Sequence, residues 1–173
     1  ENHFEQISAI ESKSLDDFEM LKKQIDDQKT KIESEIVNEA VNCLNLIYSK
    51  GLDDNDFLSQ ALPRHLKKLK CKDFNSLYSS QLESNIKKGY LYKKTLEDDK
   101  KIIIDAISGE LDAIFTRLKK KVFKFKFYKN VQTNNSPLSI LKHINSELGV
   151  IKKERNIILI SEFNKIINNQ IKN

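Results

Sequence analysis

Residues 14–49 read SLDDFEMLKKQIDDQKTKIESEIVNEAVNCLNLIYS, and this stretch decides the fold class. Its apolar residues recur at steps of three and four, which is the spacing of one face of an α-helix. These positions are Phe18, Leu21, Ile25, Ile32, Ile36, Ala40, Cys43 or Leu44, and Ile47. Ser14 and Asp17 form a capping pair at the start, and Gly51 suits a C-terminal cap. The stretch therefore predicts one helix that rises about 52 Å at 1.5 Å per residue.

A second long helix is predicted over residues 96–125, after the capping pair of Thr95 and Asp98. Its apolar stripe again follows steps of three and four. The stripe consists of Ile103, Ile107, Leu111, Ile114, Leu118, Val122 and Phe125. Gly109 lies inside this helix and costs it about 1 kcal/mol relative to alanine, so it marks a kink or the close approach of a neighbour.

Shorter helices are expected between and after the two long ones. Pro63 suits the first turn of a helix over 63–71, and Asp73 caps another over 74–88. Residues 130–136 are polar and predict a loop, after which Ser136 and Pro137 begin a helix that Gly149 ends. Leu138, Leu141, Ile144 and Leu148 share one face of that helix, and a last helix is expected over about 151–170.

Two segments are ambiguous between helix and strand. Residues 122–128 alternate Phe with Lys, which is the period of a strand, although the helical stripe also passes through them. Residues 156–161 contain a run of Ile and Leu that is compatible with a strand. Because short apolar runs cannot be assigned from their period alone, we favour helix in both and keep a small sheet as the alternative.

Composition excludes several fold classes. Only 4 Gly and 2 Pro occur in 173 residues, too few for a turn-rich β-sandwich or a fold with Gly-rich nucleotide-binding loops. No run of about 18 apolar residues is present that could span a membrane. We therefore predict an all-α protein: residues 1–173 form a single helical domain, an elongated antiparallel bundle. Because the sequence begins at Glu1, we allow for a fragment of a larger protein.

Charge is distributed unevenly along the chain, whose net charge is +5. Residues 1–60 hold 6 Lys against 14 acidic residues, whereas residues 61–100 hold 10 basic against 5 acidic and residues 101–173 hold 14 basic against 6 acidic. Two interpretations compete. The acidic first third packs against the basic remainder, which we favour, or the basic part binds a polyanion such as nucleic acid or an anionic membrane.

Two basic segments are the candidate binding surfaces. The segment 64–72, with the helix after it, has the outline of a helix-turn-helix, and the segment 117–129 interleaves Lys with Phe. The candidate residues are Arg64, Lys67, Lys68, Lys70, Lys72, Arg117, Lys119, Lys120, Lys121, Lys124, Lys126, Phe123 and Phe127. The alternatives are phosphate binding with base stacking, attachment to an anionic membrane surface, and a solvated Lys face over a Phe core, which we favour.

No motif for catalysis or for metal or cofactor binding is recognisable. His3, His65 and His143 have no second His or Cys at a ligand spacing, and we expect them to be solvated or capping residues. The isolated glycines do not form a phosphate-binding loop. Cys43 falls on an apolar stripe, where a thiol is inert. We expect no catalytic residues, no metal, no cofactor and no small-molecule substrate.

The cysteines bear on the compartment. Cys43 and Cys71 lack C-x-x-C spacing and are too few for a disulfide framework, so we expect two reduced thiols and keep a single bridge as the alternative. No signal peptide is recognisable in the sequence. Both observations favour a cytoplasmic protein.

The predicted function follows from the two long helices. We expect a non-enzymatic interaction or assembly module, a stalk or adaptor whose helices bind another protein or a second copy of the chain. Nucleic-acid binding through segments 64–72 and 117–129 is the first alternative, and peripheral attachment to anionic membranes is the second.

Overall fold

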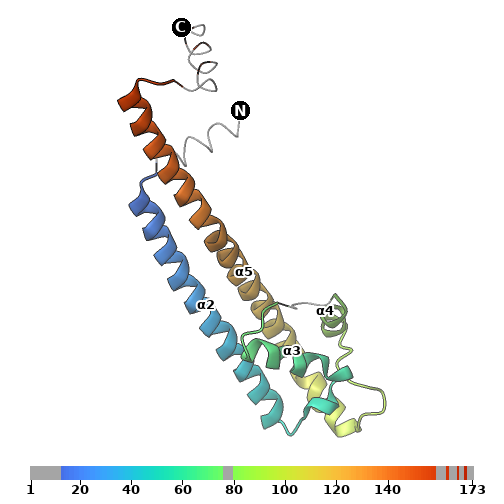
Figure 1. The fold of residues 1–173 in the computed structure, drawn as a ribbon. Helices are drawn as coiled ribbons and strands as arrows, with labels where there is room; N and C mark the ends of the chain where they lie inside the picture. Colours follow the sequence, from blue (N-terminus) through green and yellow to red (C-terminus); the bar gives the residue numbers. More distant parts are fainter. Residues whose placement is uncertain (1–12, 76–79, 159–162, 164–166, 168–169, 171–173) are drawn as a thin grey trace. The chain divides into compact units, whose positions relative to one another are not determined.

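The computed structural model describes residues 13–75 and 80–158, together with Phe163, Ile167 and Gln170. These described residues are almost entirely helical and contain no strand (Figure 1). Within this described part, an isolated antiparallel bridge joins Phe57 to Tyr92. The elements in chain order are α2 (Leu15–Ser49), η1 (Asp54–Asp56), η2 (Leu58–Gln60), α3 (Ala61–Lys70), α4 (Ser80–Lys87) and α5 (Asp98–Arg155).

The first long helix, α2, begins and ends where its capping residues predict. The Ser14 hydroxyl accepts a hydrogen bond from the Asp17 backbone N–H at 3.1 Å, and the Asp17 carboxylate accepts one from the Ser14 N–H at 2.8 Å. This reciprocal pair satisfies two N–H groups at the start of the helix. Gly51 follows the last turn with φ 75°, a left-handed conformation that glycine adopts without strain.

The second long helix, α5, is one continuous helix of 58 residues, so the strand alternative for residues 122–128 is wrong. The alternation of Phe and Lys arises because Phe123 and Phe127, four residues apart, share one helix face and are exposed. Phe125 lies on another face, where its ring meets Phe74 edge-on with 4.7 Å between centroids. A helix therefore accounts for the pattern without a sheet.

The loop predicted over residues 130–136 is also wrong, because α5 runs through it and past Pro137. Proline in a helix interior removes one backbone hydrogen bond and crowds the preceding turn. A tertiary contact lies at this point: the buried Asn135 side chain donates to the backbone carbonyl of Phe18 on α2 at 3.2 Å. Gly149 does not end the helix either. Asn156 does so with φ 56°, the conformation of a left-handed C-terminal cap.

Other predicted helices are shorter than expected or lie partly outside the described residues. The helix predicted over 74–88 is present as α4, while Phe74 and Asn75 are not helical and residues 76–79 are outside the described part. Residues 151–155 of the predicted last helix belong to α5, and most of its remainder is not described. Of the strand alternative at 156–161, residues 159–161 are likewise outside the description.

The chain divides into two compact units, Gln24–Val131 and Glu1–Lys23 with Gln132–Asn173. Within Gln24–Val131, the long helices pack together, and α3 and α4 complete one core. The core residues from α2 are Ile32, Ile36, Ala40, Cys43, Leu44 and Ile47; those from α5 are Ile104, Ile107, Leu111, Ile114, Phe115, Leu118 and Val122. The predicted stripes are thus largely confirmed. On α5, Ile104 replaces Ile103 as the fully buried residue.

The other unit carries the last part of α5, which exposes large apolar residues. Ile140, Leu141, Ile144, Val150 and Ile151 are all exposed. Ile140, Ile144 and Ile151 lie on one helix face, with Leu141 and the half-buried Leu148 beside them, and we call these five residues the C-terminal stripe. On α2, Phe18 is buried while Leu21, predicted to be a stripe residue, is exposed.

Both cysteines are free thiols, as expected, and no bridge joins them. Cys43 is buried in the core, and loss of solvation raises the pKa of its thiol to about 12, with help from the nearby charge of Glu110. The thiolate is therefore absent at neutral pH, and Cys43 acts as a small apolar core residue. Cys71 is exposed at the end of α3.

Candidate interaction surfaces

The basic segment 64–72 lies mostly on α3, and the helix separates its two kinds of side chain. Leu62, Leu66 and Leu69 are buried against the core, whereas Arg64, Lys67, Lys68 and Lys70 are exposed on the other side. The segment therefore presents its basic groups to solvent, as an amphipathic helix does.

His65 is the exception on α3, because it is buried and not solvated as predicted. Its ring lies against Phe115, with 5.5 Å between the centroids. Burial lowers the pKa of His65 to about 4, and the positive charge of Lys68 adds to this effect. The imidazole is therefore neutral at pH 7 and forms part of the core.

Two lysines of the first segment form ion pairs with acidic residues of the same chain. Lys67 pairs with Asp54 of η1, which also accepts a hydrogen bond from the Tyr48 hydroxyl at 2.9 Å. The hydrogen bond from Lys67 lowers the pKa of Asp54. Lys72 contacts Glu33 of α2, with 2.6 Å between Nζ and Oε1.

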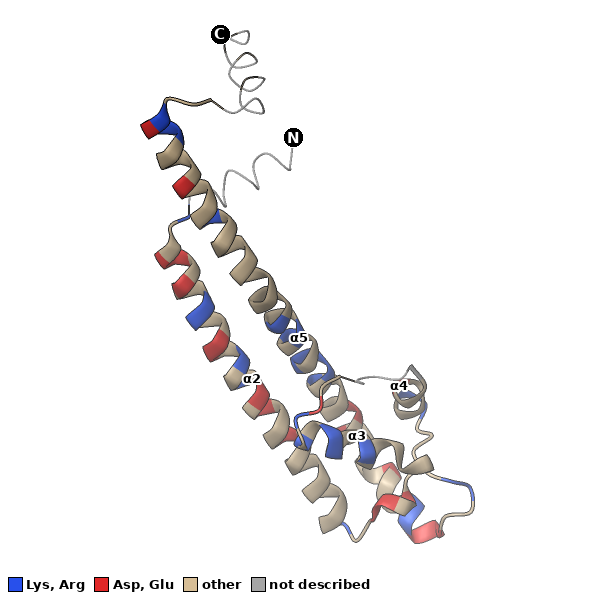
Figure 2. Ribbon diagram, in the orientation of Figure 1, with Lys and Arg blue, Asp and Glu red and all other residues tan. Residues whose placement is uncertain are grey.

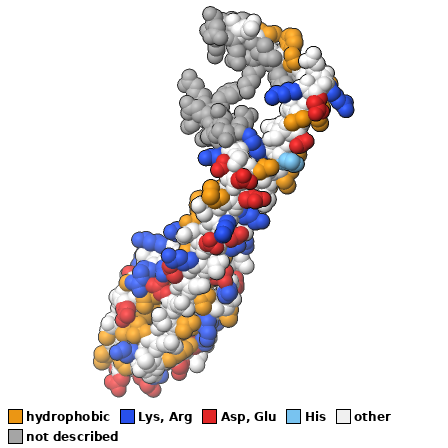
Figure 3. All heavy atoms as spheres, turned by 90° about the vertical axis from the view of Figure 1, so that its left-hand side faces the viewer, with side chains coloured by type: hydrophobic (Ala, Val, Ile, Leu, Met, Phe, Trp, Pro, Cys, Tyr) orange, Lys and Arg blue, Asp and Glu red, His pale blue; other side chains and the backbone are white. Residues whose placement is uncertain are grey.

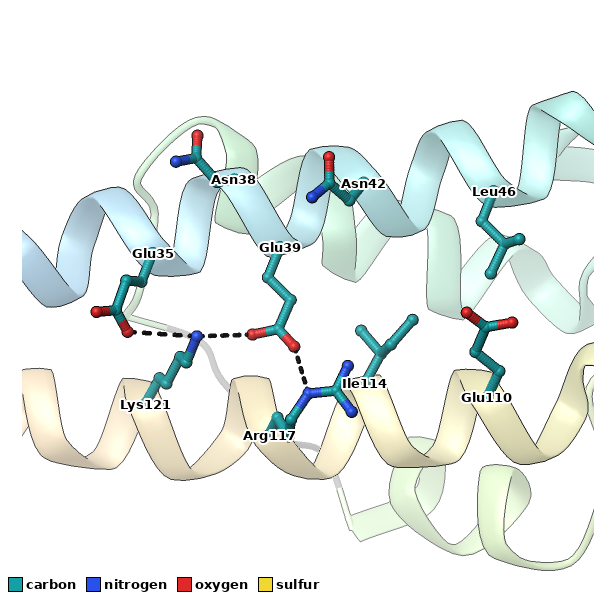
Figure 4. A pocket seen from close by; sticks show the side chains of 9 residues that line it. All are labelled: Glu35, Asn38, Glu39, Asn42, Leu46, Glu110, Ile114, Arg117 and Lys121. Atoms are coloured by element: carbon teal, nitrogen blue, oxygen red, sulfur yellow. Dashed lines mark hydrogen bonds and ion pairs between the residues drawn. The ribbon is translucent and has the colours of Figure 1, made fainter.

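The second basic segment, 117–129, forms a similar network with α2 (Figure 4). The Arg117 Nε donates to Glu39 Oε1 at 2.6 Å, and Lys121 Nζ lies 3.0 Å from Glu39 Oε2 and 3.3 Å from Glu35 Oε2. Partial burial acts to raise the pKa of Glu39, but the hydrogen bonds from Arg117 and Lys121 outweigh it, so the pKa is lowered. Lys119 pairs in the same way with Glu83 of α4 at 2.5 Å.

A groove of about 470 Å³ surrounds this network between α2 and α5. Its lining residues are Glu35, Asn38, Glu39, Asn42, Leu46, Glu110, Ile114, Arg117 and Lys121 (Figure 4). The two cations in the groove are held by Glu35 and Glu39, so their charge is already compensated. The groove is therefore best explained as a structural ion-pair network along a helix contact.

The ion pairs support the interpretation in which acidic and basic parts of the chain match internally. Figure 2 shows acidic residues along α2 and a run of basic residues on α5, and Figure 3 shows both signs of charge intermixed on the face in view. Five of the candidate residues, Lys67, Lys72, Arg117, Lys119 and Lys121, are paired with carboxylates.

The remaining candidate residues face solvent or lie near it. Among the residues that the structure describes, no carboxylate lies within 4 Å of Arg64, Lys70, Lys120 or Lys126. Lys124 Nζ lies 5.9 Å from the centre of the Tyr128 ring, a cation–π distance. Phe123 and Phe127 are 53% and 62% exposed.

Sequence reasoning missed two features of these surfaces. The acidic partners Glu33, Glu35 and Glu39 were not identified, although Glu35 and Glu39, four residues apart, lie on the same side of a helix. Ile102, which is 67% exposed, was not recognised as part of an outward face of α5. The apolar signal of that face is weak, because small and polar residues lie between Ile102 and Phe123.

Comparisons with protein-family models, with curated proteins and with solved structures found no match for this chain. Within residues 13–75 and 80–158 no helix is long and apolar enough to cross a membrane. The same described residues contain no group of three or more His, Cys, Asp or Glu side chains placed to hold a metal ion.

The ion pair of Glu39 gives a first testable prediction. Glu39→Gln should lower the free energy of unfolding at pH 7 by about 1 kcal/mol, because Arg117 and Lys121 lose their shared carboxylate. Glu35→Gln is the matched control, since Glu35 is more exposed and its contact is longer. Because the pKa of Glu39 is lowered in the folded state, the difference should shrink as the pH falls through that pKa. Urea unfolding at pH 7 and pH 3 measures the free energy of unfolding of wild type and of both variants. Equal losses of this free energy in Glu39→Gln and Glu35→Gln would contradict the prediction.

Proposed function

We propose that this chain is a non-enzymatic interaction or assembly module that binds a helical protein partner through α5. The observation that carries the proposal is the exposure of large apolar side chains at helical spacing along this helix. Three of them, Ile102, Phe123 and Phe127, lie in one unit, and the C-terminal stripe lies in the other. Leaving such side chains in water is unfavourable, and an amphipathic partner helix would cover them.

The antiparallel arrangement of the helices and the elongated shape are also part of this proposal. An antiparallel bundle is supported by the ion pairs between α2 and α5: Glu35 meets Lys121, whereas Glu39, four residues later, also meets Arg117, four residues earlier. The expectation of an elongated molecule stays a prediction from the sequence, based on the helix of about 52 Å expected over residues 14–49. X-ray scattering of the chain in solution tests it.

The C-terminal stripe offers a direct test of the interaction module. Ile144→Asp places a charge at the centre of the stripe, and Asn145→Asp places the same charge one residue away, outside the stripe. Purified from the cells that naturally make it, the wild-type chain and Asn145→Asp should retain a stoichiometric partner or a second copy. Ile144→Asp should lose it while keeping its helical circular dichroism. A wild-type chain that is always a single 20.1 kDa species would contradict the proposal.

Nucleic-acid binding is a second proposal, supported by the exposed basic groups of α3. Arg64, Lys68 and Lys70 lie on the solvent side of this helix. Retention on heparin should then fall steeply with salt, and Lys70→Glu should reduce the slope by about one counterion. Phe123 and Phe127 beside Lys120 would equally suit an anionic membrane surface, which predicts co-sedimentation with anionic but not neutral vesicles. No retention on heparin at low salt and no pelleting would remove both alternatives.

A further inference from the structure

One face of α5 between residues 102 and 127 is exposed along its whole length. Its eight residues follow alternating steps of four and three, the spacing of a coiled-coil seam. We call these residues the outer seam: Ile102, Ala106, Gly109, Ala113, Thr116, Lys120, Phe123 and Phe127. All eight are exposed, and they belong to the unit Gln24–Val131. The seam lies opposite the stripe by which α5 packs on α2 and α3.

Large and small side chains are distributed along the outer seam in a way that suits a second helix. Ile102, Phe123 and Phe127 are large and lie towards the two ends, whereas Ala106, Gly109 and Ala113 leave the backbone accessible. A Cβ placed on Gly109 would meet no atom within 4 Å, so packing within the described chain does not require glycine there. Glycine nevertheless costs a helix about 1 kcal/mol relative to alanine. Close approach of a helix from outside the chain would account for it.

The charges beside the outer seam change sign half-way along it. Asp105, Glu110 and Asp112 flank the first half, and Arg117, Lys119, Lys124 and Lys126 flank the second half. A parallel copy of the same helix would place like charges together. An antiparallel copy would place the acidic half of each helix against the basic half of the other, which is favourable. A nucleic acid or an anionic membrane would fit only the basic half.

We infer that the outer seam is the contact surface for a second copy of this chain, packed antiparallel with Ala113 and Thr116 at the centre. In this register, Ile102 of each copy lies opposite Phe127 of the other, and Ala106 lies opposite Phe123. The large Phe123 thus packs over the small Ala106, and Ile102 and Phe127 pack against each other at the two ends of the contact. This arrangement allows close packing. The inference rests on the proposed function and identifies the partner helix as a second α5.

The same register pairs the flanking charges. Asp105 comes opposite Lys126 of the second copy, and Glu110 comes opposite Arg117. Lys126 has no carboxylate within 4 Å among the described residues, so its charge is available. Asp105 accepts a hydrogen bond from Tyr92 through Oδ2, at 2.9 Å, which leaves Oδ1 for a partner. Arg117 uses Nε for Glu39, and its two terminal nitrogens remain as donors.

A charge-exchange experiment tests both the occupant and the orientation. Sedimentation equilibrium of the full chain should give a monomer–dimer equilibrium. Asp105→Lys alone and Lys126→Glu alone should each raise the dissociation constant about tenfold, because each homodimer then contains two repulsive pairs. An equimolar mixture of the two variants should recover a dissociation constant within about twofold of wild type, since both pairs become attractive in the heterodimer. Within one chain the two positions are about 31 Å apart along the helix and cannot compensate each other.

The outcomes separate this inference from the proposed function. A chain that stays monomeric at 1 mM, or a dimer that the mixture does not restore, overturns the inference. Circular dichroism of each variant must match wild type, and Lys70→Glu on α3 is the matched charge control. Assembly that is lost in Ile144→Asp but is unaffected by Asp105→Lys and by Lys126→Glu would overturn the second-copy inference. The proposed interaction module would then remain intact.

Discussion

Replacing Ile104 with alanine is expected to lower the free energy of unfolding by about 2–5 kcal/mol, the cost of a core cavity. Ile104 is fully buried within the unit Gln24–Val131, where it joins residues of α2 and α3 in the core. Ile102, two residues earlier on the same helix, is 67% exposed. The same substitution at Ile102 should change the free energy by no more than about 0.5 kcal/mol.

The pair of isoleucines makes this a matched comparison, because residue type, helix and helix propensity are the same at both positions. Urea unfolding followed by circular dichroism gives both values. The protein concentration must lie below that at which sedimentation detects dimers, since Ile102 belongs to the outer seam. Comparable losses in the two variants would show that the packing of α5 differs from the one described.

The position of Ile104 also shows where sequence reasoning stopped short. A spacing of three and four correctly identified α5 and most of its buried residues, because periodicity depends only on the chain's own order. It chose Ile103, which is half-buried, instead of its neighbour. The choice between adjacent isoleucines depends on which elements cover the helix. That information lies in the packing of α3 and the segment after α4, which no local pattern contains.

Residues 130–137 illustrate a different limit. A polar run ending in Ser136-Pro137 is typical of a loop followed by a helix start, and α5 nevertheless continues through it. A residue 117 positions earlier, Phe18, supplies the carbonyl that Asn135 binds. Local propensity is a weak prior that such contacts override. By contrast, the caps at Ser14 and Gly51 were predicted correctly, because capping involves only neighbouring residues.

The sequence predicted which basic residues form the candidate surfaces, but not which acidic residues they pair with. Sequence identified the basic segments and favoured an internal match with the acidic first third. It could not show that Lys121 lies between Glu35 and Glu39, because that contact joins residues more than 80 positions apart. Nor could it show that the outward residues of 117–129 continue the seam that begins at Ile102. The proposed interaction therefore depends on which face of α5 the core leaves exposed.

His65 provides the prediction with the clearest dependence on pH. Its folded-state pKa is about 4, whereas an unfolded histidine has a pKa of about 6.5. Between these values the unfolded chain binds more protons than the folded chain, so stability falls as the pH is lowered from 6.5 towards 4. At 1.36 kcal/mol per pH unit, the loss amounts to about 3 kcal/mol over this window.

Substitution isolates this contribution from that of the carboxylates. His65→Gln should remove most of the fall in stability between pH 6.5 and 4, whatever its effect at pH 7, because no group at position 65 then titrates. His143→Gln is the control, since His143 is exposed on α5. The ion-paired carboxylates Glu39, Asp54 and Glu83 have lowered pKa values and lose their contribution at lower pH than His65 does. Urea unfolding at half-unit pH intervals measures the slopes; parallel curves for wild type and His65→Gln would mean that the imidazole is hydrated in the folded protein.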